Sequence, residues 1–203
     1  MRDMDKSLLT DLISPLIAQV DSSMLAYASS IAESAQIRSY PAHTLIRPPE
    51  DGEGRQTICL LQGVMRAYYH TEEGTEVTVQ LYAEGRVIPR TSGYRELFPE
   101  HIYHYETLSP VQVAVWEGAE VDHLAATIPN WYMFIIRLNN YLLVQYGRRC
   151  HEMLHDDATT RYRKFVERNP TLVQRVQWRH VASYLGVAPQ SLSRIRQQFN
   201  EES

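Results

Sequence analysis

Side chains that can contact nucleic acid gather near the C-terminus, in residues 177–198, QWRHVASYLGVAPQSLSRIRQQ. The second half of this segment carries amide, hydroxyl and guanidinium groups, and no acid follows until Glu201. Groups of these kinds hydrogen-bond to base edges in the DNA grooves and to phosphate oxygens. We expect Gln190 and Arg194 to read base edges, because they lie one helical turn apart. The full set of DNA-binding candidates is Gln190, Ser191, Ser193, Arg194, Arg196 and Arg179.

Two short helices must position these side chains. Apolar residues recur at helical spacing on both sides of Gly186, at Val181, Ala182, Leu185, Leu192 and Ile195. Gly186 suits the left-handed conformation that often ends a helix, and Pro189 suits the first turn of the next one. The pattern predicts a helix-turn-helix whose second helix lies in the major groove. An ordinary helical hairpin that caps a core is the alternative.

The basic residues of the chain concentrate in the same region. The chain has 203 residues and a net charge of −4, which by itself argues against binding to nucleic acid. Residues 158–199 nevertheless carry eight Lys and Arg side chains and a single acid, Glu167. We expect this basic unit, including residues 161–168, to meet phosphate while the acidic remainder does not.

The composition, 44% apolar and 22% charged, is typical of a soluble globular protein. The N-terminus lacks the pattern of a signal peptide, and no apolar run approaches the length of a membrane span. Two cysteines, Cys59 and Cys150, are too few for a disulfide framework. We therefore expect a cytoplasmic protein with no membrane partner.

The first two thirds of the chain predict helices followed by strands. Apolar residues recur at helical spacing over residues 1–36, where Pro15 interrupts the pattern and either Asp21 or Ser22 suits the cap of a second helix. Over residues 37–116 the period changes to two, in short runs separated by turns such as the hairpin turn Glu72-Glu73-Gly74 between MRAYYH and EVTVQLY. Many short strands joined in this way indicate a roll or jelly-roll barrel.

One long helix is expected over residues 129–154, with Pro129 at its start. An apolar stripe runs along its first half. Such a stripe usually belongs to a core, but on a helix between a roll and a helix-turn-helix it also suits contact with a second copy of the chain. The predicted dimer-interface residues are Trp131, Phe134, Ile135, Leu138, Tyr141 and Leu142.

The segment VASYLGVAPQSLSRIR, residues 181–196, resembles the C-terminal helix-turn-helix of Crp/Fnr-type transcription regulators, in the short, wingless form of Bacteroidetes-like bacteria. LLQGVMRAYYHTEEGTEVTVQLYAEG, residues 60–85, is similar in layout to the β-roll of that family. The resemblance implies an α+β fold with a helical lead-in and a jelly-roll-like cyclic-nucleotide-binding-type β-roll at 1–128, a dimerisation helix at 129–155 and a DNA-binding domain at 156–203. It also implies a homodimer that is not an enzyme, with double-stranded DNA and RNA polymerase as partners.

The sensor departs from the family where cyclic nucleotides bind. Counting from Gly85, the family's Gly-Glu pair falls on Pro89 and Arg90, and its Arg-Ser pair falls near His101. Pro89 has no N–H to donate, and Arg90 offers a donor where the ribose hydroxyl needs an acceptor. We expect no binding of cyclic AMP. An unidentified small effector is an alternative ligand, with pocket candidates Arg86, Arg90, Tyr94, Arg95, His101, Tyr103 and His104; equally, these residues simply fill the roll or face water.

Metal chemistry has weaker support, and we expect no cofactor. His101 and His104 lack the pattern of a metal-dependent barrel, and Cys150, His151 and His155 lack further ligands although the two histidines share a helix face. No Ser-His-Asp, P-loop or dinucleotide pattern occurs. Three other classes stay open: a DNA binder without an effector, a small-molecule-binding β-roll protein with a vestigial helix-turn-helix, and a metal-dependent barrel enzyme.

Overall fold

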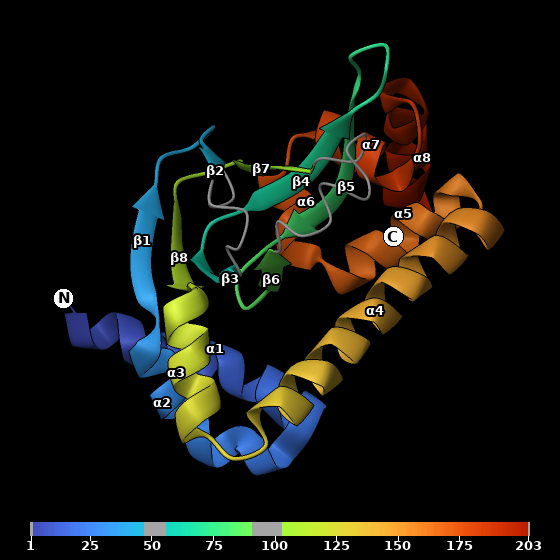
Figure 1. Cartoon of the computed structure of the whole chain (residues 1–203). Helices are drawn as coiled ribbons and strands as arrows, with labels where there is room; N and C mark the ends of the chain where they lie inside the picture. The colour runs from blue at the N-terminus through green and yellow to red at the C-terminus, as the bar shows by residue number, and fades with distance from the viewer. Residues whose placement is uncertain (1, 47–55, 91–102, 203) are drawn as a thin grey trace.

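The computed structural model describes residues 2–46, 56–90 and 103–202 of the chain (Figure 1). The architecture is α+β, as the sequence predicts: two antiparallel sheets form a β-roll, helices cover one side of it, and a second group of helices lies at the far end of a long helix (Figure 1). Within the described ranges, no helix is long and apolar enough to cross a membrane.

Three helical segments precede the β-roll, namely α1 (Arg2–Asp21), the 3-10 helix η1 (Ser22–Tyr27) and α2 (Ala28–Ser34). Helix α1 continues through Pro15, so the proline does not divide the helix, although the sequence pattern had allowed for such a break. Asp21 caps η1, because its side chain accepts a hydrogen bond from the backbone N–H of Ser23 at 3.1 Å. The apolar faces of these segments bury Leu9 and Ile31 against the β-roll.

The strands form two four-stranded sheets. One has the order β1-β8-β3-β6 and the other the order β2-β7-β4-β5. The bounds are β1 (Gln36–Tyr40), β2 (Leu45–Ile46), β3 (Gln56–Gln62), β4 (Met65–His70), β5 (Glu76–Tyr82), β6 (Val87–Arg90), β7 (His104–Thr107) and β8 (Val111–Trp116). Strands β4 and β5 form the predicted hairpin, in which Gly74 has φ +79°.

Strand β3 is buried on both faces, which explains its nearly continuous apolar sequence. Successive side chains of a strand point to opposite faces. Ile58 and Leu60 therefore enter the core between the two sheets, while Cys59 and Leu61 enter the core beneath the N-terminal helices. The β-roll is thus held from two sides, by the second sheet and by α1 and α2.

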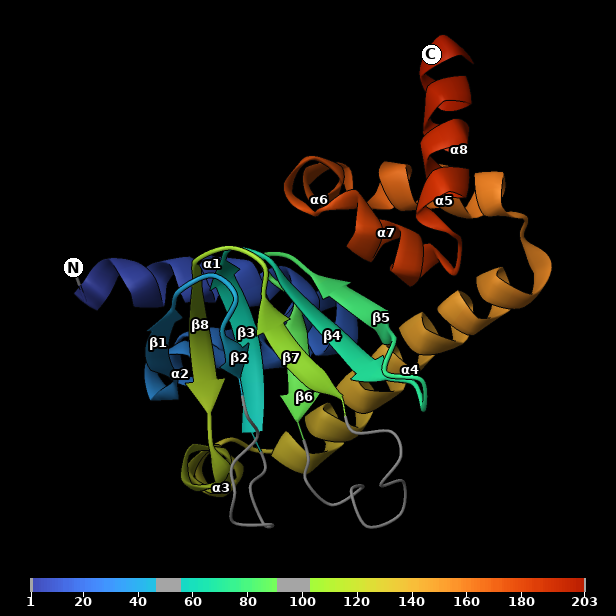
Figure 2. The same cartoon turned by 90° about the horizontal axis from the view of Figure 1, so that it is seen from above.

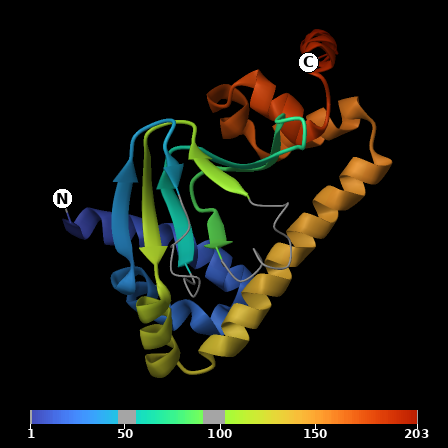
Figure 3. The ribbon, with the colours of Figure 1, turned by 45° about the horizontal axis from the view of Figure 1, so that its top comes forward.

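Two helices follow the β-roll, α3 (Gly118–Thr127) and α4 (Trp131–His155). Helix α4 begins at Trp131 rather than at Pro129, because Asn130 takes a left-handed conformation with φ +60°. Its first turns pack on the N-terminal helices, and it then runs diagonally across the molecule with one side bare of other elements (Figures 1 and 3).

The C-terminal helical unit comprises α5 (Ala158–Arg168), α6 (Pro170–Arg175), α7 (Trp178–Leu185) and α8 (Pro189–Glu202). Asp157 caps α5 by accepting from the backbone N–H of Thr160 at 2.7 Å. The core of the unit is formed chiefly by its own residues, including Tyr162, Leu172 and Leu192, and Val64 and Leu81 of the β-roll extend it. This unit lies beside β5, and α8 projects away from the β-roll (Figure 2).

Candidate nucleic-acid interface

The turn between α7 and α8 has the geometry that the sequence predicts for a helix-turn-helix. Gly186 ends α7 with φ +65°, and its N–H donates to the carbonyl of Ser183 at 3.1 Å. The N–H of Val187 donates to the carbonyl of Ala182 at 3.0 Å. Leu192 of α8 is buried against α7. These contacts fix the angle at which α8 leaves the turn.

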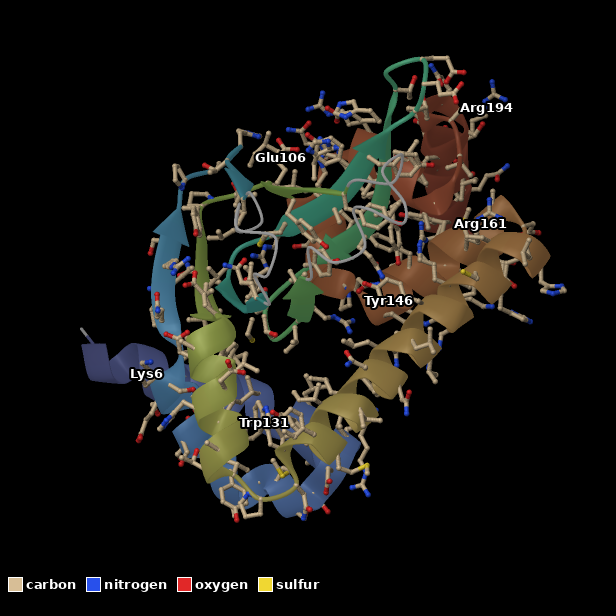
Figure 4. The ribbon with its side chains drawn as sticks, viewed as in Figure 1. Lys6, Glu106, Trp131, Tyr146, Arg161 and Arg194 are labelled. Carbon is tan, nitrogen blue, oxygen red and sulfur yellow. The ribbon has the colours of Figure 1, made fainter. Side chains whose placement is uncertain are left out.

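Helix α8 presents most of the predicted DNA-binding side chains to solvent. Gln190, Ser191, Ser193 and Arg194 are all exposed, and Figure 4 places Arg194 on the outer side of α8. The helix carries no acid before Glu201, so this surface is positive and rich in donors. It can therefore meet base edges and phosphates without an internal competitor.

Two other candidates have partners within the helical unit. The guanidinium of Arg196 lies 3.9 Å from the centre of the Trp178 ring, in a cation–π contact. Arg179 is exposed, and its Nε lies 3.3 Å from Nε2 of His180. Both side chains are therefore partly oriented by neighbours within the helical unit.

The basic residues of helix α5 differ in whether they have partners within the helical unit. Arg161 donates to the backbone carbonyls of Leu185 at 3.0 Å and Asp156 at 2.6 Å. Lys164 forms an ion pair with the carboxylate of Asp156 at 2.6 Å. Arg163 is exposed and remains the α5 cation best placed to meet phosphate.

A buried arginine joins the helical unit to the β-roll. Arg66 of β4 is only 4% exposed, and its Nε donates to Glu106 at 2.6 Å while its Nη2 donates to Glu76 at 2.5 Å. In a third contact, Nη1 of Arg66 lies 3.0 Å from Nδ1 of His180 on α7. The guanidinium also lies 4.0 Å from the centre of the Tyr68 ring. We call these residues the Arg66 network; Figure 4 shows Glu106 within the cluster of polar side chains above the β-roll.

His180 is held in its neutral form by this environment. Burial lowers the pKa of His180 from 6.5 to about 4, and the positive charges of Arg66 and Arg179 add to the effect. An imidazolium would turn its N–H groups toward two guanidinium groups, which are themselves donors. The neutral ring instead accepts a hydrogen bond from Arg66.

Two further contacts fasten the helical unit to the β-roll. The side chain of Arg175 makes two hydrogen bonds to Glu84, at 2.7 and 2.8 Å. The hydrogen bond from Arg175 lowers the pKa of Glu84 to about 2. The Oγ of Ser183 accepts from the backbone N–H of Thr78 at 2.8 Å, which occupies a backbone donor at the outer strand of its sheet.

Comparisons with known proteins identify the fold. No protein-family model and no curated protein matches the sequence. Similar solved structures include FixK2 from Bradyrhizobium japonicum, which is 16% identical with a TM-score of 0.68 over 83% of this chain and 85% of that chain. CLP, a c-di-GMP-responsive global regulator from Xanthomonas campestris, is 16% identical with a TM-score of 0.59 over 86% of this chain and 92% of that chain. CooA from Carboxydothermus hydrogenoformans, in a mutant form, is 12% identical with a TM-score of 0.60 over 84% of this chain and 78% of that chain.

The chain has the Crp/Fnr-type fold. At these identities the likeness establishes the fold, and function must be argued from the residues.

The predicted effector-pocket residues do not form one site among those described. The side chain of Arg90 and all of Tyr94, Arg95 and His101 lie outside the described residues. Arg86 lines a cavity that faces α4, whereas His104 contacts the rings of Tyr68 and His70 in the other sheet, with ring centres 5.2 Å apart in both cases. Tyr103 is exposed.

Metal binding gains no support within the described ranges. The rings of His151 and His155 lie 4.4 Å apart on α4, as their spacing predicts. No group of three or more His, Cys, Asp or Glu side chains gathers there in a way that could hold a metal ion.

The predicted dimer-interface stripe on α4 packs inside the chain at its N-terminal end. Trp131 and Phe134 are each 5% exposed and belong to the core shared with the N-terminal helices, and Ile135 packs against that core (Figure 4). Leu138, Tyr141 and Leu142 are half-buried on the same side, where the last two line the cavity beside the β-roll. For Trp131 and Phe134 the prediction of an intersubunit contact is therefore corrected.

Proposed function

We propose that the protein is a homodimeric transcription regulator that reads DNA with the exposed face of α8. The observation that carries this proposal is the helix-turn-helix itself, whose second helix is fixed by the turn at Gly186 and by the buried Leu192 and presents Gln190 and Arg194 to solvent. The Crp/Fnr-type fold supports it. A helical hairpin that merely capped a core would gain nothing from an acid-free, projecting second helix.

We infer that the dimer forms through the bare side of α4. Seven residues there alternate steps of three and four, the spacing of a coiled-coil seam. They are Met133, Ile136, Asn140, Leu143, Gly147, Cys150 and Leu154, which we call the seam residues. Their apolar members are unusually exposed for their size: Leu154 is 82%, Leu143 67% and Ile136 52% exposed. Large apolar side chains at such spacing are typical of contact with a second copy of the helix.

The polar and small seam residues fit the same interpretation. An asparagine in a coiled-coil seam favours one register, because it is best satisfied by its own counterpart. Gly147 has no atom within 4 Å of the place where its Cβ would lie, which leaves room for a partner helix to approach. The seam thus specifies a parallel pairing in which equivalent residues meet across the twofold axis.

Cyclic AMP is not the effector that this sensor favours. Pro89 and Arg90 lie in strand β6, where they pair with Thr57 and Gln56 of β3. A strand position filled by proline cannot donate an N–H to a ligand. An effector, if one binds the described part of the chain, must use other residues.

The DNA-binding proposal is tested by the ratio of specific to random affinity. The dimer should select an inverted repeat from random DNA, with half-sites about one helical turn, roughly 10 bp, apart. Arg194→Ala should lose about 1–3 kcal/mol of discrimination, so the ratio should fall. Arg163→Ala is the matched control, since it should weaken both DNAs alike. An unchanged ratio in Arg194→Ala would show that α8 does not read bases.

The dimer proposal is tested by sedimentation equilibrium at micromolar concentration. Leu143→Glu should release monomers, because it places a charge in the seam. Leu8→Glu, at an exposed position of α1, is the matched control and should remain dimeric. A wild-type monomer, or equal dissociation of both variants, would contradict the assignment of this face.

A further inference from the structure

We propose that a cavity between the β-roll, α4 and the helical unit is a binding site for a small polyanion, a molecule carrying two or more phosphate or carboxylate charges. The cavity has a volume of about 380 Å³, which is within the range of small-molecule sites. Its walls come from β5 and β6, from the second half of α4, and from α5 and the end of α7. We call it the junction cavity; Tyr146 extends into this region from α4 in Figure 4.

Its lining is strongly and asymmetrically charged. Among the described residues that line the cavity, Glu152 is the single acid. Six cations of the same described set line it: Arg86, Arg148, Arg149, Arg161, Lys164 and Arg168. Like charges gathered around a concave site repel one another unless an anion joins them. The charge therefore predicts the sign of the ligand.

Two of these arginines are held in place by backbone carbonyls and form no ion pair with the described residues. Arg149 donates to the carbonyl of Tyr184 at 2.7 Å, and its guanidinium lies 3.9 Å from the centre of the same residue's ring. Arg161 donates to the carbonyls of Leu185 and Asp156. Carbonyl oxygens fix the direction of a guanidinium but leave its charge intact. Since arginine has five N–H donors, both side chains keep donors for a ligand.

The other four cations fall into two pairs. Lys164 and Arg168 are compensated by ion pairs with Asp156 and Glu152, both at 2.6 Å. Arg86 and Arg148 are exposed, and in the described residues neither forms an ion pair. A ligand with two or more charges would thus meet Arg149 and Arg161 at the wall and Arg86 and Arg148 at the rim.

The remaining lining suits a small hydrogen-bonding molecule rather than a duplex. Burial raises the pKa of Tyr82 well above its ordinary value, and the neighbouring Tyr146, to which it is hydrogen-bonded, adds to this, so the Tyr82 phenol is a neutral hydrogen-bonding group of the wall. Leu142 and Phe165 add an apolar part. A concavity of this size cannot admit double-stranded DNA, which needs a convex or grooved surface along several base pairs. A small polyanion fits both the volume and the charge.

The experiment is calorimetry with the full-length protein, with no DNA present, using sodium pyrophosphate and citrate as separate probes at constant ionic strength. We expect saturable binding of one probe molecule per chain, with the better probe showing whether phosphate or carboxylate is preferred. Arg86→Gln/Arg148→Gln should weaken that binding at least tenfold. Both substituted residues are exposed and outside any packed core, and the melting temperature of the variant checks its fold.

Arg163→Gln is the matched control, because Arg163 is an exposed cation of α5 that does not line the cavity. Equal weakening by the control and the double variant would mean general charge attraction and would overturn the proposal. Absence of saturable binding of both probes at millimolar concentration would also overturn it. If the wild type binds neither probe, and a separate measurement shows that the double variant has lost affinity for random DNA, the proposal is overturned and the rim is assigned to DNA instead. Because no DNA is present in the calorimetry, a failure of the probes to bind would leave the proposed DNA-binding function untouched.

Discussion

Replacement of His180 by glutamine should remove a specific part of the protein's pH dependence. In the native structure His180 is buried between Arg66 and Arg179, and its pKa is lowered from 6.5 to about 4. Because the native pKa is the lower one, the unfolded or undocked state binds the proton first. The stability that depends on neutral His180 is therefore complete above pH 6.5 and is lost as the pH falls from 6.5 toward 4.

The size of the effect follows from the two pKa values. A shift from 6.5 to about 4 corresponds to about 3 kcal/mol once the pH is below both values. Between pH 7.5 and 5.5 the loss should already be about 1.3 kcal/mol, by the same linkage. His180→Gln keeps an acceptor for Arg66 in its side-chain oxygen but has no proton to gain. The variant should therefore not show this additional loss of stability between pH 7.5 and 5.5.

The assay is urea unfolding at both pH values, followed by tryptophan fluorescence, in the wild type, His180→Gln and His123→Gln. The carboxylates that also face His180, Glu76 and Glu106, remain in all three proteins, so their contribution to stability largely cancels when the proteins are compared. His123 is exposed on α3, and its variant should follow the wild type. The reasoning is refuted if His180→Gln loses as much stability between pH 7.5 and 5.5 as the wild type does.

Three further substitutions probe the same elements by urea unfolding. Glu84→Gln should lower the free energy of unfolding by up to about 1 kcal/mol at pH 7, because the two hydrogen bonds from Arg175 are weakened in a solvent-accessible setting. Since the pKa of Glu84 is about 2, the stability that its charge contributes should fade as the pH drops from 4.5 toward 2. A difference between variant and wild type that is as large at pH 3 as at pH 7 would contradict this. Leu192→Ala should cost about 2–5 kcal/mol, since the side chain is fully buried at the contact of α7 and α8, and a loss below 1 kcal/mol would mean that this contact is loose. Gly186→Ala should cost about 1–2 kcal/mol because φ is +65°, with the new Cβ also 2.6 Å from the flexible Met153 Cε; an unchanged midpoint would mean that the turn relaxes.

Local patterns in the sequence were sufficient for the helix-turn-helix and the hairpin. Gly186 takes the left-handed conformation that its place between two periodic segments indicated, and Gly74 lies in the hairpin turn that was predicted there. The spacing of Leu192 and Ile195 likewise gave the buried side of α8. In each case the deciding interactions lie within about a dozen residues, so the sequence contains them directly.

The junction between the two parts of the chain could not be predicted in the same way. Arg66 and His180 are 114 residues apart, and only the packing of α7 against the β-roll brings them together. The one local signal was a charged residue inside the run of apolar and aromatic residues that forms β4, which is costly unless the charge is paired. That signal indicates a partner but does not identify it.

Helix α4 shows why its sequence indicated a different face from the one that we propose for the dimer. The strongest apolar stripe, which includes Trp131 and Phe134, marks the face that packs inside the chain. The opposite face is interrupted by Asn140, Gly147 and Cys150, so its average apolar character is low. Periodicity alone ranks faces by apolar content, whereas a coiled-coil seam tolerates polar and small residues at single positions.

The same geometry separates the two proposed roles of α4. Since each residue advances about 100° around a helix, Leu143 and Gly147 lie on the face opposite to Gln145 and Arg149, which line the junction cavity. A second copy of the chain seated on the seam would leave the cavity wall free for a ligand. Arg149 in turn holds the carbonyl of Tyr184, two residues before the glycine that ends α7. A polyanion that bound the Arg149 guanidinium would compete with its hydrogen bond to Tyr184. Such a ligand would therefore affect the helix-turn-helix through α4 itself, without first having to change the dimer contact.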